Sequence, residues 1–252
     1  MSIDYDKETL LVSDDKAFYT LEGEGEFVGM PSVFFRLSMC NLTCKGFASE
    51  DSPHGCDSYI SWSVKNKMTF NEIFEYFEKH NLVEKLKNGA IFKLTGGEPM
   101  VQQKQLLKFI GAFIEKYDFH PLIDFETNAT IKPDEKWIEL YRATFTTSPK
   151  LTSNGDPEKR TYKPEVLKWH RDVGSGFKFV INVSEDIDEI WSKYVEDGEI
   201  NIPKSRIWFM PCSGSRQEHV ERAPAVAEYA KAMNVNFSPR LHLLLWDMAL
   251  KV

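Results

Sequence analysis

The sequence predicts an α/β fold in which helical crossovers connect the strands of a mostly parallel sheet, either open or closing toward a barrel. Two observations lead to this prediction. Short apolar runs of strand type alternate with longer stretches whose apolar residues recur at helical spacing. Polar or glycine-rich segments directly follow most of those runs, as expected where ligands bind at the carboxyl ends of parallel strands.

Length and composition indicate a globular chain that we expect to form one domain over residues 1–252. Hydrophobic residues make up 42% of the chain, which is ordinary for such proteins, and there is no internal repeat or Pro/Gly-rich linker. The net charge of −7 makes nucleic acid and anionic membranes poor partners. No apolar run reaches about 18 residues. The charged segment 1–11 lacks a secretory core, so we expect a cytoplasmic protein with no membrane span.

The first expected elements are a strand at residues 33–37 and a helix at 69–86. Residues 33–37 form a compact apolar run. In the second segment apolar side chains recur at helical spacing from Phe70 to Leu82, and Thr69 is a plausible N-cap.

The middle of the chain repeats this unit of strand and helix. Short buried-type runs predict strands at 91–94, 122–126 and 143–147. Helical spacing of apolar residues predicts helices at 102–117 and 134–141.

The last third continues the alternation. Helices are expected at 164–170, 184–194 and 217–233, and strands at 177–182 and 207–210. A final apolar run at 241–246 is expected to be the last strand.

Three of the four cysteines, Cys40, Cys44 and Cys56, lie within 17 residues, which indicates metal binding or catalysis more than disulfides in a reducing cytosol. A cubane cluster held by three thiolates keeps one iron open for a non-protein ligand. The same cysteines with His54 would also suit a structural zinc ion, and the cysteines alone favour neither reading. Cys212 is more readily a small buried filler than a site residue.

Residues 93–99 (KLTGGEP) join an expected strand to an expected helix. The paired glycines let the backbone pass close to a ligand, and the Glu98 carboxylate can accept a hydrogen bond from an ammonium group. A plain strand-to-helix turn is the alternative for this segment alone. Residues 126–128 (ETN) and 148–150 (SPK) would add polar groups at two neighbouring strand ends, although each alone is more often a turn.

Taken together, these motifs resemble those of radical S-adenosylmethionine enzymes, and within them the 7-carboxy-7-deazaguanine synthase family. The resemblance is collinear from about Tyr19 onward. It rests on residues 20–25 (TLEGEG), 29–31 (GMP), 35–37 (FRL), 40–44 (CNLTC), 56–58 (CDS), 94–99 (LTGGEP), 126–128 (ETN), 148–150 (SPK), 178–180 (KFV), 238–242 (SPRLH) and 245–246 (LW).

The resemblance implies a partial (β/α)6-type radical SAM barrel, usually in a homodimer, with a [4Fe–4S] cluster on Cys40, Cys44 and Cys56. The open iron would bind S-adenosyl-L-methionine, which reduction would cleave to a 5′-deoxyadenosyl radical. The radical would act on 6-carboxy-5,6,7,8-tetrahydropterin, which becomes 7-carboxy-7-deazaguanine with loss of ammonia in 7-deazapurine (queuosine/preQ0-type) biosynthesis. The expected enzyme is thus a lyase, with a flavodoxin- or ferredoxin-type electron donor.

Family positions also imply individual roles. The residues that would line the cofactor are Gly97, Glu98, Asn128, Ser148, Pro149 and Lys150. Those that would bind the substrate are Leu21, Glu22, Gly23, Arg36 and Thr95. Arg36 suits a bidentate contact to the substrate carboxylate, a structural ion pair being the alternative. A magnesium ion, Mg²⁺, would be held by the hydroxyl of Ser58.

Three departures from the family pattern bear on these roles. The cysteine spacing is C-x3-C-x11-C instead of C-x3-C-x2-C, and the extra segment 47–55 is expected to be a surface loop. Glu22 stands where the family usually has Gln, and a carboxylate accepts but cannot donate. Ser58 replaces the usual Thr and keeps the hydroxyl.

Two other functions remain open from the sequence. An activase of a glycyl-radical enzyme or of an anaerobic ribonucleotide reductase would share the cluster motif but act on a protein. A non-enzymatic zinc-bound domain would use the same cysteines.

Overall fold

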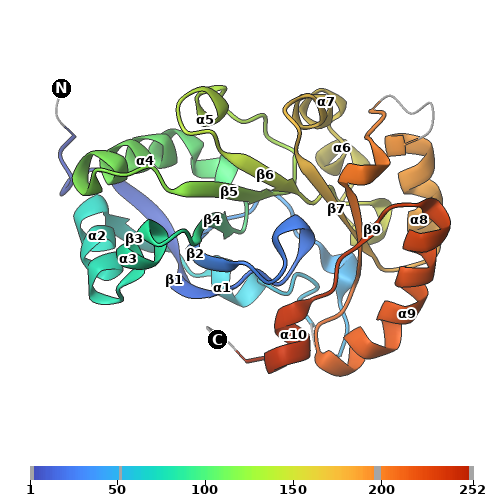
Figure 1. Cartoon of the computed structure of the whole chain (residues 1–252). Helices are drawn as coiled ribbons and strands as arrows, with labels where there is room; N and C mark the ends of the chain where they lie inside the picture. The colour runs from blue at the N-terminus through green and yellow to red at the C-terminus, as the bar shows by residue number, and fades with distance from the viewer. Residues whose placement is uncertain (1–2, 51–52, 196–199, 250–252) are drawn as a thin grey trace.

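The computed structural model describes residues 3–50, 53–195 and 200–249, and a curved sheet of nine strands runs through this part of the chain (Figure 1). The strands, in sheet order, are β3 (Asn66–Thr69), β1 (Thr9–Leu21), β2 (Pro31–Leu37), β4 (Ile91–Gly96), β5 (Leu122–Thr127), β6 (Thr144–Thr147), β7 (Gly176–Ile181), β8 (Ile207–Pro211) and β9 (Asn236–Phe237). Neighbours from β2 to β9 are parallel, whereas β1 pairs antiparallel with β2 and β3. The predicted α/β class with a mostly parallel sheet is confirmed.

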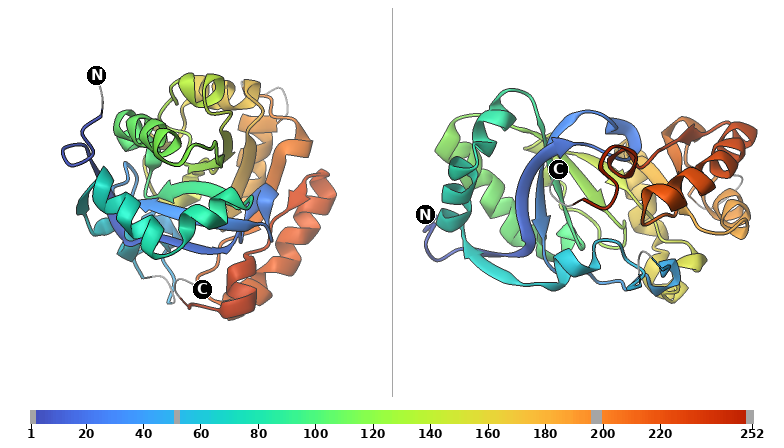
Figure 2. Two further views of the ribbon diagram at one scale, coloured as in Figure 1. Left: turned by 60° about the vertical axis from the view of Figure 1, so that its left-hand side comes forward. Right: turned by 90° about the horizontal axis from the view of Figure 1, so that it is seen from below.

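Most helices connect the parallel strands and lie outside the curved sheet, whereas α10 follows the last strand (Figures 1 and 2). They are α1 (Tyr59–Ser63), α2 (Phe70–Lys79), α3 (Leu82–Lys87), α4 (Gln103–Tyr117), α5 (Lys136–Glu139), α6 (Glu158–Thr161), α7 (Pro164–Asp172), α8 (Glu185–Ile190), α9 (Arg216–Met233) and α10 (Leu241–Trp246). None of the helices within residues 3–50, 53–195 and 200–249 has the length and apolar character that a membrane crossing needs.

The side chains of each strand alternate between the two faces of the sheet, and the faces differ in chemistry. The outer face is apolar and packs under the helices through Val33, Phe35, Leu37, Phe92, Leu94, Phe125, Phe145, Phe177 and Phe179. The inner face is polar and charged, with side chains that contact one another: Lys93, Thr95, Asp124, Glu126, Thr146 and Lys178. This alternation turns the inside of the partial barrel into a polar chamber.

The outer apolar residues form two clusters that divide between β6 and β7. The larger cluster joins β1 to β6 with α2 and α4, and the smaller joins β7 and β8 with α8 and α9. β6 and β7 are joined by only two residue pairs, Thr146 with Gly176 and Thr147 with Phe177. Each of the other parallel pairs between β2 and β8 has at least four. That the whole chain is one domain stays a prediction.

The helix expected at residues 69–86 begins as predicted but is interrupted. Thr69 caps α2 in a capping box with Glu72, in which each side chain bonds the other's backbone N–H. The helix then ends at Lys79, because Asn81 adopts a left-handed backbone (φ 58°) and starts the separate helix α3. The apolar pattern continues through the break because both helices cover the same outer face.

At the ends of the chain one prediction was wrong and one strand was missed. Residues 241–246 form the helix α10, not a strand, and Leu243 is its buried side chain. A short apolar run cannot be assigned by periodicity alone. The long strand β1 was missed, because a register irregularity between Val12 and Ala17 and the charged residues within it hide its alternation.

Candidate active site

A cavity of about 600 Å³ opens at the carboxyl ends of the parallel strands, which is the size of a small-molecule site. Its lining comes from the loop after β2, from α1, from the segments that follow β4, β5, β6 and β8, and from α10. All the site residues expected from the sequence line it except Glu98 and Pro149. The motifs at the ends of the strands therefore come together in one cavity, as expected for neighbouring strands of a parallel sheet.

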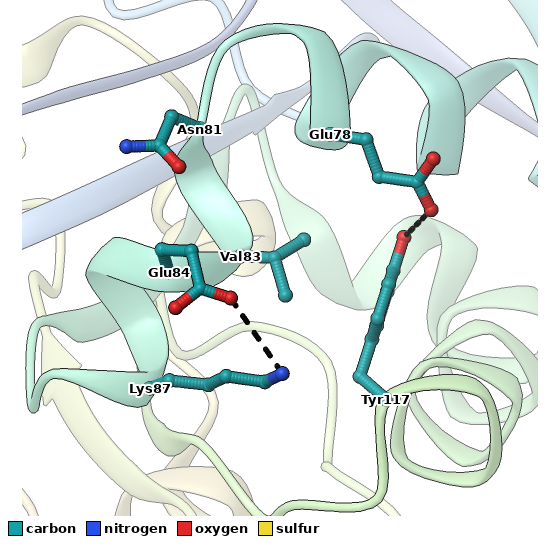
Figure 3. A pocket seen from close by; sticks show the side chains of 6 residues that line it. All are labelled: Glu78, Asn81, Val83, Glu84, Lys87 and Tyr117. Carbon is teal, nitrogen blue, oxygen red and sulfur yellow. Dashed lines mark hydrogen bonds and ion pairs between the residues drawn. The ribbon is translucent and has the colours of Figure 1, made fainter.

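A second hollow, of about 210 Å³, lies away from these strand ends, where α2, α3 and the end of α4 come together (Figure 3). Four of its polar side chains form two pairs: Tyr117 donates to Glu78 over 2.8 Å, and Lys87 lies 3.6 Å from Glu84. It contains none of the expected site residues.

Cys40, Cys44 and Cys56 are free thiols that face the large cavity. Burial raises the pKa of Cys40 to about 11 and that of Cys56 to about 12, and it raises the pKa of Cys44 as well. Such thiols are protonated at neutral pH, so binding as thiolates requires the positive charge of a metal centre. Within residues 3–50, 53–195 and 200–249, no three His, Cys, Asp or Glu side chains surround a common single-ion position.

The loop that carries Cys44 is held by the segment after β6. The carboxylate of Asp156 accepts hydrogen bonds from the backbone N–H groups of Thr43 and Cys44, both at 2.8 Å, and from the Thr43 hydroxyl at 3.0 Å. Cys44 has a left-handed backbone (φ 52°), a conformation that needs such support in a non-glycine residue. Gly46 packs so closely on this segment that a Cβ there would lie 2.1 Å from the Ser153 carbonyl oxygen.

Each cysteine sulfur has an N–H donor nearby. Trp62 Nε1 lies 3.4 Å from Cys56 Sγ, and Asn154 Nδ2 lies 3.7 Å from Cys44 Sγ. Cys40 Sγ accepts from the backbone N–H of Leu42 at 3.5 Å. The three contacts come from three different parts of the chain.

The paired glycines allow β4 to end against the cysteine loop. A Cβ on Gly96 (φ 130°) would lie 2.0 Å from the Leu37 carbonyl oxygen. A Cβ on Gly97 would lie 2.1 Å from the Met39 carbonyl oxygen and 3.0 Å from Cys40 Cβ. Only glycine fits at either position, so this motif is more than a plain turn.

Glu98 lies behind the cavity wall and not in it, with 0% of its surface exposed. Its carboxylate already accepts three hydrogen bonds, from Met100 N (3.0 Å), the Thr127 hydroxyl (2.8 Å) and Asn128 N (2.7 Å). Burial raises its pKa to about 7 against these donors. Glu98 therefore holds the backbone of Asn128 in place, and its carboxylate does not face the cavity.

The other expected cofactor residues lie at the strand ends after β5 and β6. Asn128 lines the cavity and donates to Asn41 over 2.9 Å, beside Cys40. The ammonium of Lys150 folds back onto Ser148, 2.7 Å from its hydroxyl and 3.0 Å from its carbonyl oxygen. Pro149 is buried and does not line the cavity.

Glu22 belongs to a buried group of three charges. Its Oε2 lies 2.8 Å from the ammonium of Lys93, which lies 2.6 Å from Asp124. Burial raises the pKa of Glu22, although Lys93 opposes this effect. Burial alone would lower the pKa of Lys93, but Asp124 and Glu22 hold it above its usual value. The other oxygen of Glu22 accepts from the backbone N–H of Gly23 at 3.0 Å, so this side chain fixes the loop that enters the cavity.

A second charged group lines the cavity beside the first, and of its members the sequence placed only Glu126 among the polar groups at the strand ends. Lys178 on β7 bonds Glu24 and lies 2.6 Å from Glu126 on β5. Arg240 lies 2.8 Å from Glu24 and also bonds Asp57. Lys178 lowers the pKa of Glu126 to about 2, although burial opposes it. The sequence carried a signal for Glu126, which follows Asp124 by two positions in β5, and for Lys178, a charge within the apolar strand β7.

Arg36 and Ser58 lie side by side at the cavity wall. The Arg36 guanidinium lies 5.7 and 5.8 Å from the ring centres of Phe18 and Phe34, and 4.0 Å from Asp15. Its Nη1 lies 3.4 Å from the Ser58 hydroxyl, which donates to Asp57 over 3.2 Å. Arg36 Nε is buried on the side of Asp15 and has no hydrogen-bond partner among the described residues, so any ligand contact falls to the part of the side chain that lines the cavity.

The segment 47–55 includes residues 51–52, which lie outside the described residues. Its end returns to the site, because a Cβ on Gly55 (φ 84°) would lie 2.4 Å from the Cys44 carbonyl oxygen. The ring of His54 stacks on Tyr59, with ring centres 4.8 Å apart. Cys212 lines the cavity after β8, and burial raises its pKa to about 11.

Comparisons with known proteins agree with this geometry. A family model described as a 4Fe-4S single cluster domain matches residues 21–137. The chain is 28% identical to the 7-carboxy-7-deazaguanine synthase of Hyperthermus butylicus, over 91% of the chain and 90% of the relative. It is 30% identical to the synthase of Halobacterium salinarum, over 93% and 90%. The crystal structure of QueE from Escherichia coli shares the fold, with a TM-score of 0.59 and 20% identity over 92% of this chain and 95% of that one.

Proposed function

The chain belongs to the 7-carboxy-7-deazaguanine synthase family, and from this membership we propose that it converts 6-carboxy-5,6,7,8-tetrahydropterin to 7-carboxy-7-deazaguanine with loss of ammonia. The observation that carries the proposal is the meeting of three free cysteines and a charged strand interior in one cavity of about 600 Å³. The activase alternative has less support, because the relatives named above are synthases.

We propose Cys40, Cys44 and Cys56 as the cluster ligands. Three soft sulfur donors facing one cavity fit a [4Fe–4S] cluster with one open iron, and the matching family model is a single-cluster domain. The bound cluster and S-adenosyl-L-methionine together supply the reductive cleavage that generates a 5′-deoxyadenosyl radical.

Gly97, Asn128, Ser148 and Lys150 are proposed to line the S-adenosyl-L-methionine. Gly97 supports this role because its backbone passes beside Cys40 with no room for a side chain. Asn128 lines the wall next to the same cysteine. Glu98 and Pro149 are proposed to act from behind the wall, Glu98 by holding the backbone of Asn128 in place.

The substrate is proposed to lie over the charged inner face. Arg36 would take its carboxylate, because this cationic side chain lines the cavity and its guanidinium packs beside the stacked rings of Phe18 and Phe34. The pterin ring carries donors and acceptors, and Glu126, Lys178 and Glu24 offer groups of both kinds. Thr95 would position Glu126, to which it donates over 3.0 Å. Leu21, Glu22 and Gly23 would form the adjoining wall.

Ser58 is proposed as a Mg²⁺ ligand, supported by the neighbouring carboxylate of Asp57, since Mg²⁺ prefers oxygen ligands. A homodimer, a flavodoxin- or ferredoxin-type electron donor, a cytoplasmic location and a product that enters 7-deazapurine biosynthesis are proposed from family membership.

The test is an anaerobic assay of the reconstituted protein with the tetrahydropterin, S-adenosyl-L-methionine and a strong reductant, read by mass spectrometry of the product. We expect 7-carboxy-7-deazaguanine to form, and the Cys56→Ala variant to lose both iron and product. Cys212→Ala is the matched control and should keep its cluster. A Cys56→Ala protein with a full cluster and activity would show that the ligand assignment is wrong.

A further inference from the structure

The side-chain donors nearest to two cysteine sulfurs lie outside every motif that identified the site. Trp62 belongs to α1 and Asn154 to the turn η4 (Thr152–Asn154). Their N–H groups lie 3.4 Å from Cys56 Sγ and 3.7 Å from Cys44 Sγ, within the range of hydrogen bonds to sulfur. Neither residue is needed for the apolar core of the barrel.

Trp62 connects two of the three cysteines. Its indole N–H points to Cys56, and its backbone carbonyl accepts from the N–H of Met39, the residue before Cys40, at 3.2 Å. The ring is kept in place by an edge contact with Tyr59, with ring centres 5.1 Å apart. The direction of the N–H is therefore set by α1 and is independent of any bound group.

Asn154 is fixed in the same way at Cys44. It has 0% exposed surface, and its Oδ1 accepts from the backbone N–H of Asp156 at 2.8 Å. That bond leaves the amide NH2 directed at Cys44, while Asp156 holds the Cys44 backbone at 2.8 Å. One short segment thus sets the position of this cysteine and places a donor on its sulfur.

We propose that Trp62 and Asn154 are positioning residues that hydrogen-bond the cluster-binding sulfurs of Cys56 and Cys44, and that they set the reduction potential of the cluster. The inference rests on the proposed cluster site. Hydrogen bonds to the sulfurs of an iron–sulfur cluster favour its reduced state, because reduction adds negative charge that the donors stabilise. Loss of a donor should therefore make reduction harder.

The test is an anaerobic redox titration of the reconstituted full chain, followed by electron paramagnetic resonance. Trp62→Phe keeps an aromatic ring and removes the N–H. We expect it to retain about four irons per chain and to show a midpoint potential more negative by about 59 mV, which is a tenfold change in a one-electron equilibrium. Trp169→Phe is the matched control. Trp169 lies on α7 and its indole N–H bonds Glu135 at 2.9 Å, so the potential of this variant should equal that of the wild type.

Asn154→Leu gives a second, independent measurement if Trp62→Phe does not fold. The two changes act on different sulfurs, so their shifts should add in the double variant. Iron content and potential equal to the wild type in a folded Trp62→Phe or Asn154→Leu protein would overturn the inference while leaving the proposed function intact. A folded wild type that binds no iron would instead overturn the proposed function, and the inference with it.

Discussion

Lys93 is the residue on which the first charged group of the chamber depends. It has 1% exposed surface and is the base that lies between the carboxylates of Glu22 and Asp124. The buried ammonium of Lys93 on β4 thus explains why a carboxylate, Glu22, stands where the family usually has Gln. Its carboxylate is committed to Lys93 and to the loop backbone, which the sequence pattern alone did not reveal.

Replacing Lys93 by Met should leave two buried carboxylates without their base and lower the free energy of unfolding by about 3–5 kcal/mol. The double variant Lys93→Met/Glu22→Gln should recover part of this loss, because Asp124 keeps hydrogen bonds from Thr144 (2.7 Å) and Thr146 (3.0 Å). Urea unfolding checks both. Lys87→Met, which breaks an exposed pair with Glu84, should cost under about 1 kcal/mol. Equal losses at Lys93 and Lys87 would contradict this account.

His170 should make stability depend on pH. It has 0% exposed surface, its Nδ1 pairs with the Ser175 hydroxyl at 3.0 Å, and burial lowers its pKa from 6.5 to about 3. Between these values the unfolded chain binds a proton that the folded chain does not, so stability falls as pH decreases below 6.5, by roughly 1.4 kcal/mol per pH unit. Unfolding of the wild type and His170→Asn at pH 7 and pH 5 measures this. A variant with an unchanged pH slope would be evidence against the assignment.

At the scale of elements, the segment from η4 to α6 has the least expected role. It follows β6, where the sequence indicated only a cofactor contact at residues 148–150. Its Asp156 holds Thr43 and Cys44, which lie 113 and 112 positions earlier in the chain. The local sequence does not predict such a contact, because residues 154–156 (Asn-Gly-Asp) also have the composition of an ordinary turn.

Asp156→Asn should weaken the cysteine loop, since an amide can accept from only one oxygen where the carboxylate uses two. We expect less iron retained per chain after a chelator challenge, and a loss of stability of about 1–3 kcal/mol. Asp172→Asn is the control, because that carboxylate pairs with Arg171 on the surface. Iron retention equal to that of Asp172→Asn would contradict the proposed support.

Whether an element could be predicted from the sequence depended on how clear its hydrophobic pattern is. Strands with an apolar outer face and helices with a strong stripe were predicted correctly. The strand β1 was missed because charges interrupt it, and α10 was assigned as a strand because a six-residue run with five apolar side chains fits either period. Motif positions identified the cavity wall. They did not reveal Lys178, Glu24 and Arg240 as partners, since only the folded register brings them together.

For the whole molecule, the two-pair junction between β6 and β7 is the narrowest connection in the parallel part of the sheet from β2 to β8. The apolar clusters also divide there. We expect amide protons of β6 and β7 to exchange with solvent faster than those of β4 and β5, because fewer backbone bonds must open. Native-state hydrogen exchange measures this difference. Slower exchange at β6 and β7 than at β4 and β5 would contradict it.

The alternation of faces along these strands limits how the protein can change over evolution. Deleting one residue within β2, β4 or β7 would turn charges outward beneath the helices and push aromatic rings into the chamber, so folding and chemistry would be lost together. Length changes are tolerable only between strands, which is where the extra residues at 47–55 occur. New specificity in this chain can therefore arise by length changes in the loops that line the cavity, or by point substitution on the inner face with a compensating partner such as Lys93 beside Glu22.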